Sequence, residues 1–99
     1  MKKMVYIAQR CERKDTTDIW NVGVTFDLEE ARVACKRDWE HMTRFEQIRN
    51  RQYIEGYMLD VEDGETAGDA YNRAIDNDEL CRDPNYYEEM GAYVLQEED

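Results

Sequence analysis

The chain has 99 residues, of which 41% are hydrophobic and 37% are charged, and its formal net charge is −11. This length and composition favour one folded domain spanning residues 1–99 and argue against a disordered or low-complexity chain. The apolar run after Lys3 is too short for a secretion signal, and no run approaches the ~20 apolar residues of a membrane helix, so we expect a cytoplasmic protein with no membrane partner.

The first two elements that the pattern predicts are strands over residues 4–11 and 19–26. Alternation in the first strand should place Val5 and Ile7 on one face of a sheet, with Tyr6 and Ala8 on the other. Four apolar side chains of the second strand should share one face: Trp20, Val22, Val24 and Phe26. The polar segment between the two strands favours an antiparallel hairpin.

A long helix should follow from Asp27, whose side chain can cap the free amides of the first turn. Glu30 lies three residues later, where the acid of a capping box belongs. Seven apolar residues then recur every three or four positions and predict one continuous stripe: Leu28, Ala31, Cys35, Trp39, Met42, Phe45 and Ile48. We expect this helix to lie across one face of the sheet and to bury its stripe together with the Trp20 face.

The remaining elements are a third strand over 52–61, a helix from about 65 to 76, a short helix over 84–90 and a last strand over 92–96. Imperfect alternation in the third strand indicates either a bulge at Gly56 or a strand covered on both faces. The order β-β-α-β-α-α-β predicts an α+β fold. Its small antiparallel sheet of three or four strands should pack on one long amphipathic helix.

Residues with the chemistry of catalysis are scarce. The chain has no serine, and His41 is its one histidine, so it offers no nucleophile–base pair at a recognisable spacing. The glycines form no phosphate-binding loop. The three cysteines are neither paired nor spaced as zinc ligands, and Cys35 should be a buried thiol. We therefore expect a non-enzymatic protein with no cofactor.

Metal binding is the remaining chemical possibility, because carboxylates are abundant. The segment 60–65 superficially resembles a calcium loop. With Gly64 at the sixth position of such a loop, however, the first position falls on Leu59, which has no oxygen ligand to offer. We therefore expect no dedicated metal site.

The charge is unevenly distributed along the chain. Residues 1–59, which we call the neutral half, hold 10 acids and 11 bases, which is net +1. Residues 60–99, the acidic half, hold 14 acids and two bases, which is 2 − 14 = −12. Such a concentration of like charge opposes folding, and either a partner or a well-solvated loop should offset that cost. The candidate partner-binding residues are Asp60, Glu62, Asp63, Glu65, Asp69, Asp76, Asp78, Glu79, Asp83, Tyr86, Tyr87, Glu88 and Glu89.

Small size, acidity and clustered charge give this chain a pattern that resembles phage and mobile-element inhibitors that mimic nucleic acid, of the anti-CRISPR and anti-restriction type. The resemblance covers roughly residues 60–99 and includes no specific motif. The opening Val5-Tyr6-Ile7-Ala8 is also similar to the first strand of ArdA-type anti-restriction proteins. The resemblance implies that the partner is a basic nucleic-acid-handling protein. The net charge of −11 opposes binding to DNA, so we expect that the chain does not bind DNA directly.

Two alternatives remain open at this stage. The acids can serve solubility alone, on a small accessory protein with no acidic binding surface. The mildly basic segment 32–51 can also dock on the acidic half, either within one chain or head to tail between chains in a homo-oligomer.

Overall fold

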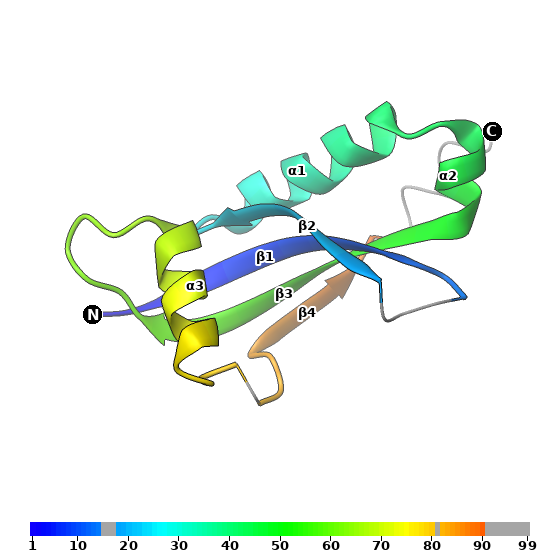
Figure 1. Cartoon of the computed structure of the whole chain (residues 1–99). Coiled ribbons are helices and arrows are strands. Elements are labelled where there is room, and N and C mark those ends of the chain that lie inside the picture. Colours follow the sequence, from blue (N-terminus) through cyan, green and yellow to red (C-terminus); the bar gives the residue numbers. More distant parts are fainter. Residues whose placement is uncertain (15–17, 81, 91–99) are drawn as a thin grey trace.

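The computed structural model describes residues 1–14, 18–80 and 82–90, which form an α+β fold with a four-stranded antiparallel sheet and three helices (Figure 1). In chain order the elements are β1 (Lys2–Glu12), β2 (Ile19–Thr25), α1 (Leu28–His41), α2 (Arg44–Arg49), β3 (Asn50–Asp60), α3 (Ala67–Asp76) and β4 (Tyr86–Glu89). The strands lie in the order β2-β1-β3-β4. The predicted fold class and hairpin are confirmed, while the predicted strand 92–96 lies outside the described residues.

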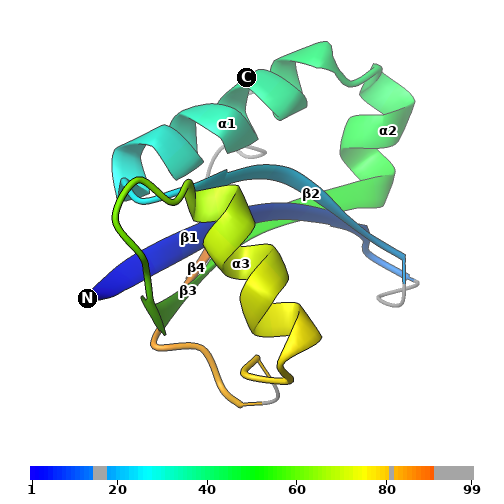
Figure 2. The same cartoon turned by 60° about the vertical axis from the view of Figure 1, so that its left-hand side comes forward.

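Helices cover both faces of the sheet, with α1 on one face and α3 on the other (Figures 1 and 2). The alternation of β1 supplies both cores, as the sequence predicted: Val5 and Ile7 pack in the cluster under α3, and Ala8 packs in the cluster under α1. β3 is covered on both faces in the same way, with Leu59 toward α3 and Ile54 toward α1. The double coverage explains the imperfect apolar alternation of β3.

A bulge in the β1–β2 pair changes which side chains of β2 share a face. Ala8 pairs with Gly23 and Gln9 pairs with Asn21, so Val22 has no partner on β1. An extra residue reverses the alternation of the strand beyond it. Val24 therefore packs in the α3-side cluster, Val22 packs in the α1-side cluster, and the predicted common face is wrong.

The start of α1 matches the predicted cap and differs from the predicted capping box. The Asp27 side chain accepts a hydrogen bond from the Glu29 amide at 2.8 Å, which confirms the cap. Glu30 does not reach back to the Asp27 amide. Its carboxylate accepts from the Thr25 hydroxyl at 2.6 Å, and that hydroxyl oxygen accepts from the Asp27 amide.

The predicted long helix is two helices, which is a correction to the continuous stripe. Thr43 adopts an extended conformation and caps α2, and Thr43 and Glu46 form a reciprocal capping box over 3.0 and 3.2 Å. The chain turns at this point, so the stripe is buried only as far as Met42. Phe45 and Ile48 lie beyond it and are exposed.

The predicted short helix over 84–90 is also wrong, because β4 occupies these residues. Tyr86 to Glu89 pair with β3, and the Asn85 side chain accepts from the Met58 amide at 2.8 Å. Without β4 the outer amides and carbonyls of β3 would lack partners, and two adjacent tyrosines suit a strand. Tyr86 packs so closely on Gly56 that a Cβ at Gly56 would lie 3.0 Å from the Tyr86 Cβ.

Candidate functional site

The described acids of the acidic half fall into two groups, those with a partner inside the chain and those without. Four form ion pairs with bases of the same chain. The pairs are Asp60 with Lys2, Glu65 with Arg73, Glu88 with Arg32, and Glu89 with Arg51. Three of the four bases belong to the neutral half, so part of the acidic half is neutralised by the part of the chain that precedes it.

Glu65 fastens the loop between β3 and α3. Its carboxylate accepts from Arg73 over 2.8 and 3.0 Å and from the Glu62 amide at 3.0 Å. The hydrogen bonds from Arg73, followed by the one from the Glu62 amide, lower the pKa of Glu65 to about 2. Arg73 also donates to the Asp60 carbonyl at 2.7 Å. Glu65 therefore has a structural partner for its charge, and it precedes α3 rather than lying in it as predicted.

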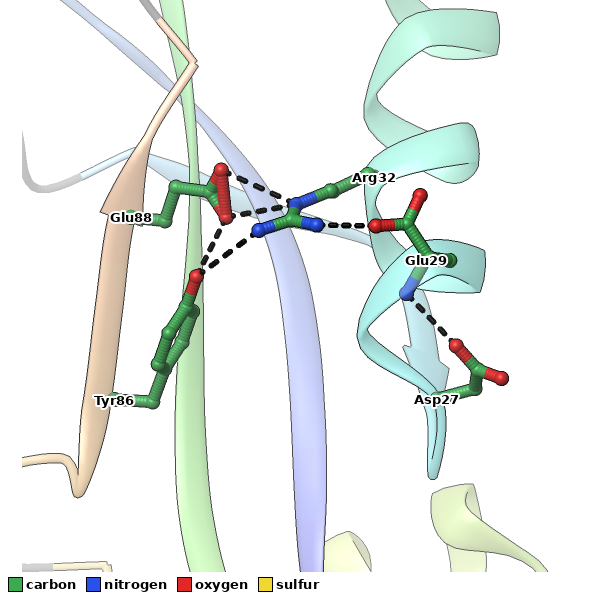
Figure 3. A network of polar contacts seen from close by, with 5 residues as sticks. All are labelled: Asp27, Glu29, Arg32, Tyr86 and Glu88. Atoms are coloured by element: carbon green, nitrogen blue, oxygen red, sulfur yellow. Dashed lines mark hydrogen bonds and ion pairs between the residues drawn. The ribbon is translucent and has the colours of Figure 1, made fainter.

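Glu88 joins β4 to α1 through Arg32 (Figure 3). Arg32 Nε donates to both oxygens of Glu88 at 3.0 and 3.2 Å, and Arg32 also pairs with Glu29 one turn away. The Tyr86 hydroxyl donates to Glu88 at 2.8 Å and accepts from Arg32 at 3.4 Å. The bonds to Glu88 and then Glu29 raise the pKa of Arg32 above its usual range. Both charges of this pair are satisfied inside the chain.

Glu89 has a similar arrangement on the outer end of β4. Arg51 donates to its carboxylate at 2.6 Å and to the Tyr87 hydroxyl at 3.3 Å. The two tyrosines and two glutamates of β4 thus contribute to the sheet and its ion pairs. Each of the four was predicted as a partner-binding residue, and each takes part in these internal contacts, unlike the acids described next.

Seven carboxylates form a second group, which we call the α3 acidic surface: Glu62, Asp63, Asp69, Asp76, Asp78, Glu79 and Asp83. All seven are exposed. Within residues 1–14, 18–80 and 82–90, none of the seven side chains takes part in an ion pair or a hydrogen bond. They lie on α3, which covers one face of the sheet near the start of β1, and on the loops at its two ends (Figures 1 and 2).

The positions of these acids on α3 differ in their effect on the helix. Asp69 lies in the first turn, where the positive end of the helix dipole stabilises a negative charge. Asp76 is the last residue of α3, and Asp78 and Glu79 follow it, where the negative end of the dipole opposes them. Asp78 also has a φ of 56°, in the left-handed region that non-glycine residues seldom adopt. This end of the surface is unfavourable for stability.

The other end of the sheet carries exposed apolar side chains, which the sequence did not lead us to expect. Trp20, Phe45 and Ile48 are 44, 64 and 59% exposed. They border two pockets of ≈ 180 and ≈ 400 Å³ between α2 and β1, whose walls also include Arg13, Lys14 and Arg49. We call these six residues the α2 surface. Thr43-x-x-Glu46 is the signal that reveals the helix break and hence this surface.

The two residues whose side chains could act in catalysis, His41 and Cys35, both make contacts within the fold. His41 is exposed, and its Nδ1 lies 2.6 Å from the Arg37 carbonyl of the same helix. Cys35 is buried as predicted, and burial, followed by the charge of Asp38, raises the pKa of its thiol to about 12. Among the described residues, no three His, Cys, Asp or Glu side chains are grouped as metal ligands.

Comparison with known proteins gives no match: no family model, no curated protein and no solved structure matches this chain. None of the helices in the described part of the chain is long and apolar enough to cross a membrane.

Proposed function

We propose that this chain is a non-catalytic binding protein whose α3 acidic surface occupies the nucleic-acid-binding site of a basic protein. This proposed function is similar to that of inhibitors of the anti-CRISPR and anti-restriction type, which mimic nucleic acid. A phage-defence effector is the kind of partner that it implies. The observation that carries the proposal is the division of the acids into a paired and an unpaired group.

The unpaired group is informative because it reduces the stability of the free chain. Like charges on one surface repel, and carboxylates at the carboxyl end of a helix oppose its dipole. A basic partner would relieve both effects. Acids that served only to complete the fold would instead have internal partners, as Glu65 and Glu88 do.

The geometry of α3 suits a stretch of backbone phosphates. Asp69 and Asp76 are seven residues apart, so they lie on one face about 10 Å apart along the helix axis. Duplex DNA carries one charge per ~1.7 Å of its axis, and proteins hold it largely through Lys and Arg. Ile75, which is 45% exposed, adds an apolar contact within the same surface. Arg73 subtracts little from the negative potential, because Glu65 neutralises it.

A competition assay tests the proposal. A labelled duplex is bound to a basic DNA-binding effector, such as a CRISPR effector complex or a restriction endonuclease, and the chain is added as competitor. The wild-type chain should release the duplex, and the release should weaken as salt is added. The chain alone should leave the anisotropy of the duplex unchanged at about 0.15 M salt, because its net charge is −11.

Two variants with the same change in net charge separate the acidic surface from general acidity. Asp76→Lys with Glu79→Lys should abolish competition. Asp18→Lys with Glu40→Lys, which changes two exposed acids elsewhere that form no described ion pair, should leave competition intact. If the two variants release the duplex equally well from such effectors, the α3 acidic surface is not the binding site and its acids serve solubility alone.

A further inference from the structure

The α2 surface has the composition of a binding site rather than of a solvated helix. Its three apolar side chains are large and exposed, and they gather in one patch. Two of them belong to α2, which buries no residue. Arg10 lies over the Trp20 ring at 5.3 Å and Arg49 over the Phe45 ring at 5.2 Å. Aromatic rings with arginines beside them are the residues that interface centres favour.

The α2 surface is also positive. Its two pockets are bordered by four bases and two acids, and both acids have partners inside the chain. Glu12 pairs with Arg49 at 3.6 Å. Glu46 accepts hydrogen bonds in its capping box, which lower its pKa. In the described part of the chain, Arg13 and Lys14 are exposed and form no ion pair, so they leave the surface with a positive potential.

The two surfaces lie at opposite ends of an elongated molecule. β1 runs from one to the other: Lys2 pairs with Asp60 at the acidic end, and Glu12 pairs with Asn50 at the α2 end. Figure 1 shows α3 and α2 at the two ends of the sheet, and the molecule measures 44 × 25 × 19 Å. Residues 60–85, which contain the acidic surface, hold nine acids and two bases, which is net 2 − 9 = −7. A positive apolar surface and a strongly negative surface therefore point away from each other.

We infer that the α2 surface is a docking site for the α3 acidic surface of a second copy of this chain. The contact is head to tail, with Arg13 and Lys14 facing the carboxylates at the end of α3 and the exposed Phe45 meeting the exposed Ile75. Because the two surfaces differ, each added copy leaves one of each kind free, so the assembly extends unless its rotation closes a ring. The inference goes beyond the proposed function and assigns a second use to the same acids.

Sedimentation velocity at two salt concentrations tests whether the association exists. At about 0.01 M salt, where the Debye length is about 30 Å, the sedimentation coefficient should rise with protein concentration. At about 1 M salt, where this length is about 3 Å, the association constant should fall roughly tenfold or more. A chain that stays monomeric at both salt concentrations overturns the inference.

Mixing two neutralised variants tests the head-to-tail geometry. The first is Lys14→Gln with Phe45→Ala, and the second is Asp76→Asn with Asp78→Asn and Glu79→Gln. Each variant alone should be monomeric at low salt. An equimolar mixture should give a 1:1 dimer and nothing larger, because one intact surface of each kind remains. Variants that associate alone, or a mixture that stays monomeric while the wild type associates, overturn the geometry.

The substituted side chains are exposed, so thermal unfolding should show that both variants fold. The same variants separate this inference from the proposed function. In the competition assay, the Lys14→Gln/Phe45→Ala variant keeps its acidic surface and should still displace DNA from the effector. A monomeric wild type that competes for the effector overturns the self-association alone. A chain that assembles head to tail without competing overturns the proposed function alone.

Discussion

A helix lies at each end of the sheet, α3 at one and α2 at the other, and the two helices are attached to the fold in different ways. α3 buries Ala67, Ala70 and Ala74 against the sheet, and its exposed residues include Asp69 and Asp76. α2 buries no residue and is held by its capping box and by side-chain bonds such as Gln47 Nε2 to the Trp39 carbonyl at 2.9 Å. Small side chains let α3 lie close to the sheet, whereas α2 exposes its large ones.

At each end of the molecule, the groups that hold the helix in place therefore differ from the exposed groups that are available for recognition. At the α3 end, packing of alanines supports a surface whose charges oppose folding. At the α2 end, hydrogen bonds support a helix whose apolar side chains contribute little to the fold. Each end thus presents exposed groups that oppose the stability of the free chain: carboxylates that repel one another at the α3 end, and apolar side chains in contact with water at the α2 end.

The sharpest stability contrast is between two aromatic residues of the predicted stripe. Trp39→Ala should lower the free energy of unfolding by about 3–5 kcal/mol, because Trp39 is only 2% exposed and its loss leaves a cavity. Phe45→Ala should change it by less than about 1 kcal/mol, because it removes an exposed ring that contacts Arg49. Urea melts measure both. A large loss for Phe45→Ala would mean that α2 is part of the core.

The helix caps should show a smaller contrast of the same kind. Asp27→Ala removes the cap of α1, which packs on the sheet, and should lower the free energy of unfolding by about 0.5–2 kcal/mol. Thr43→Ala should increase hydrogen exchange of the α2 amides while leaving that of β3 unchanged, because α2 buries no residue. Faster exchange throughout the sheet in Thr43→Ala would contradict the separation of the two ends.

Acid should weaken the α3 end through Glu65. Its pKa of about 2 in the fold lies below the ~4.3 of a free glutamate, so its stabilising effect is complete above about pH 4.3 and is lost as pH falls toward 2. Carboxyl NMR should show the low midpoint. Glu65→Gln, which lacks this ionisation, should lose less stability between pH 5 and about pH 2.5 than the wild type. Equal losses would mean that the pair with Arg73 is absent in solution.

The smallest expected effect concerns the alkylation rate of Cys35, which lies on α1 between the two ends of the sheet. Its thiol pKa of about 12 leaves roughly one group in ten thousand ionised at about pH 8, and the thiolate is the reactive form. Alkylation mapped by mass spectrometry should therefore be slow at Cys35 in the folded chain and fast in denaturant. The Thr43→Ala variant supplies the control, since fraying of α2 should not speed this reaction. Rapid native alkylation would show that α1 opens from the sheet.

The elements that followed from the sequence are those fixed by local periodicity. The alternation of β1 and the stripe of α1 as far as Met42 each repeat at one period, and both were predicted. The bulge at Val22, by contrast, depends on how two strands pair, and β4 depends on the unpaired edge of β3. Both arise from tertiary contacts that no short window of sequence contains. Thr43 is an exception, since its capping box is a local signal that the apolar stripe obscured.

The candidate site was predictable only in outline. The concentration of acids after residue 59 is plain in the sequence, but their division into paired and unpaired groups is not. Arg32 and Glu88 are 56 positions apart, and Arg51 and Glu89 are 38 apart, so the pairs exist only once β4 joins the sheet. The α2 surface was not predicted, because Phe45 and Ile48 have the same apolar spacing as the predicted core stripe.

β1, one of the two inner strands, also determines how the molecule responds to mechanical force. β1 is hydrogen-bonded to β3 along its whole length and to β2 over its second half, and it runs parallel to the line between the two end surfaces. Its ladder bonds lie perpendicular to that line. Tension applied between the ends therefore loads these bonds in shear, and many must break together, whereas a pull across the sheet would peel them apart one by one. In a head-to-tail assembly each copy would act as a tension-bearing link, with the contacts between copies yielding first.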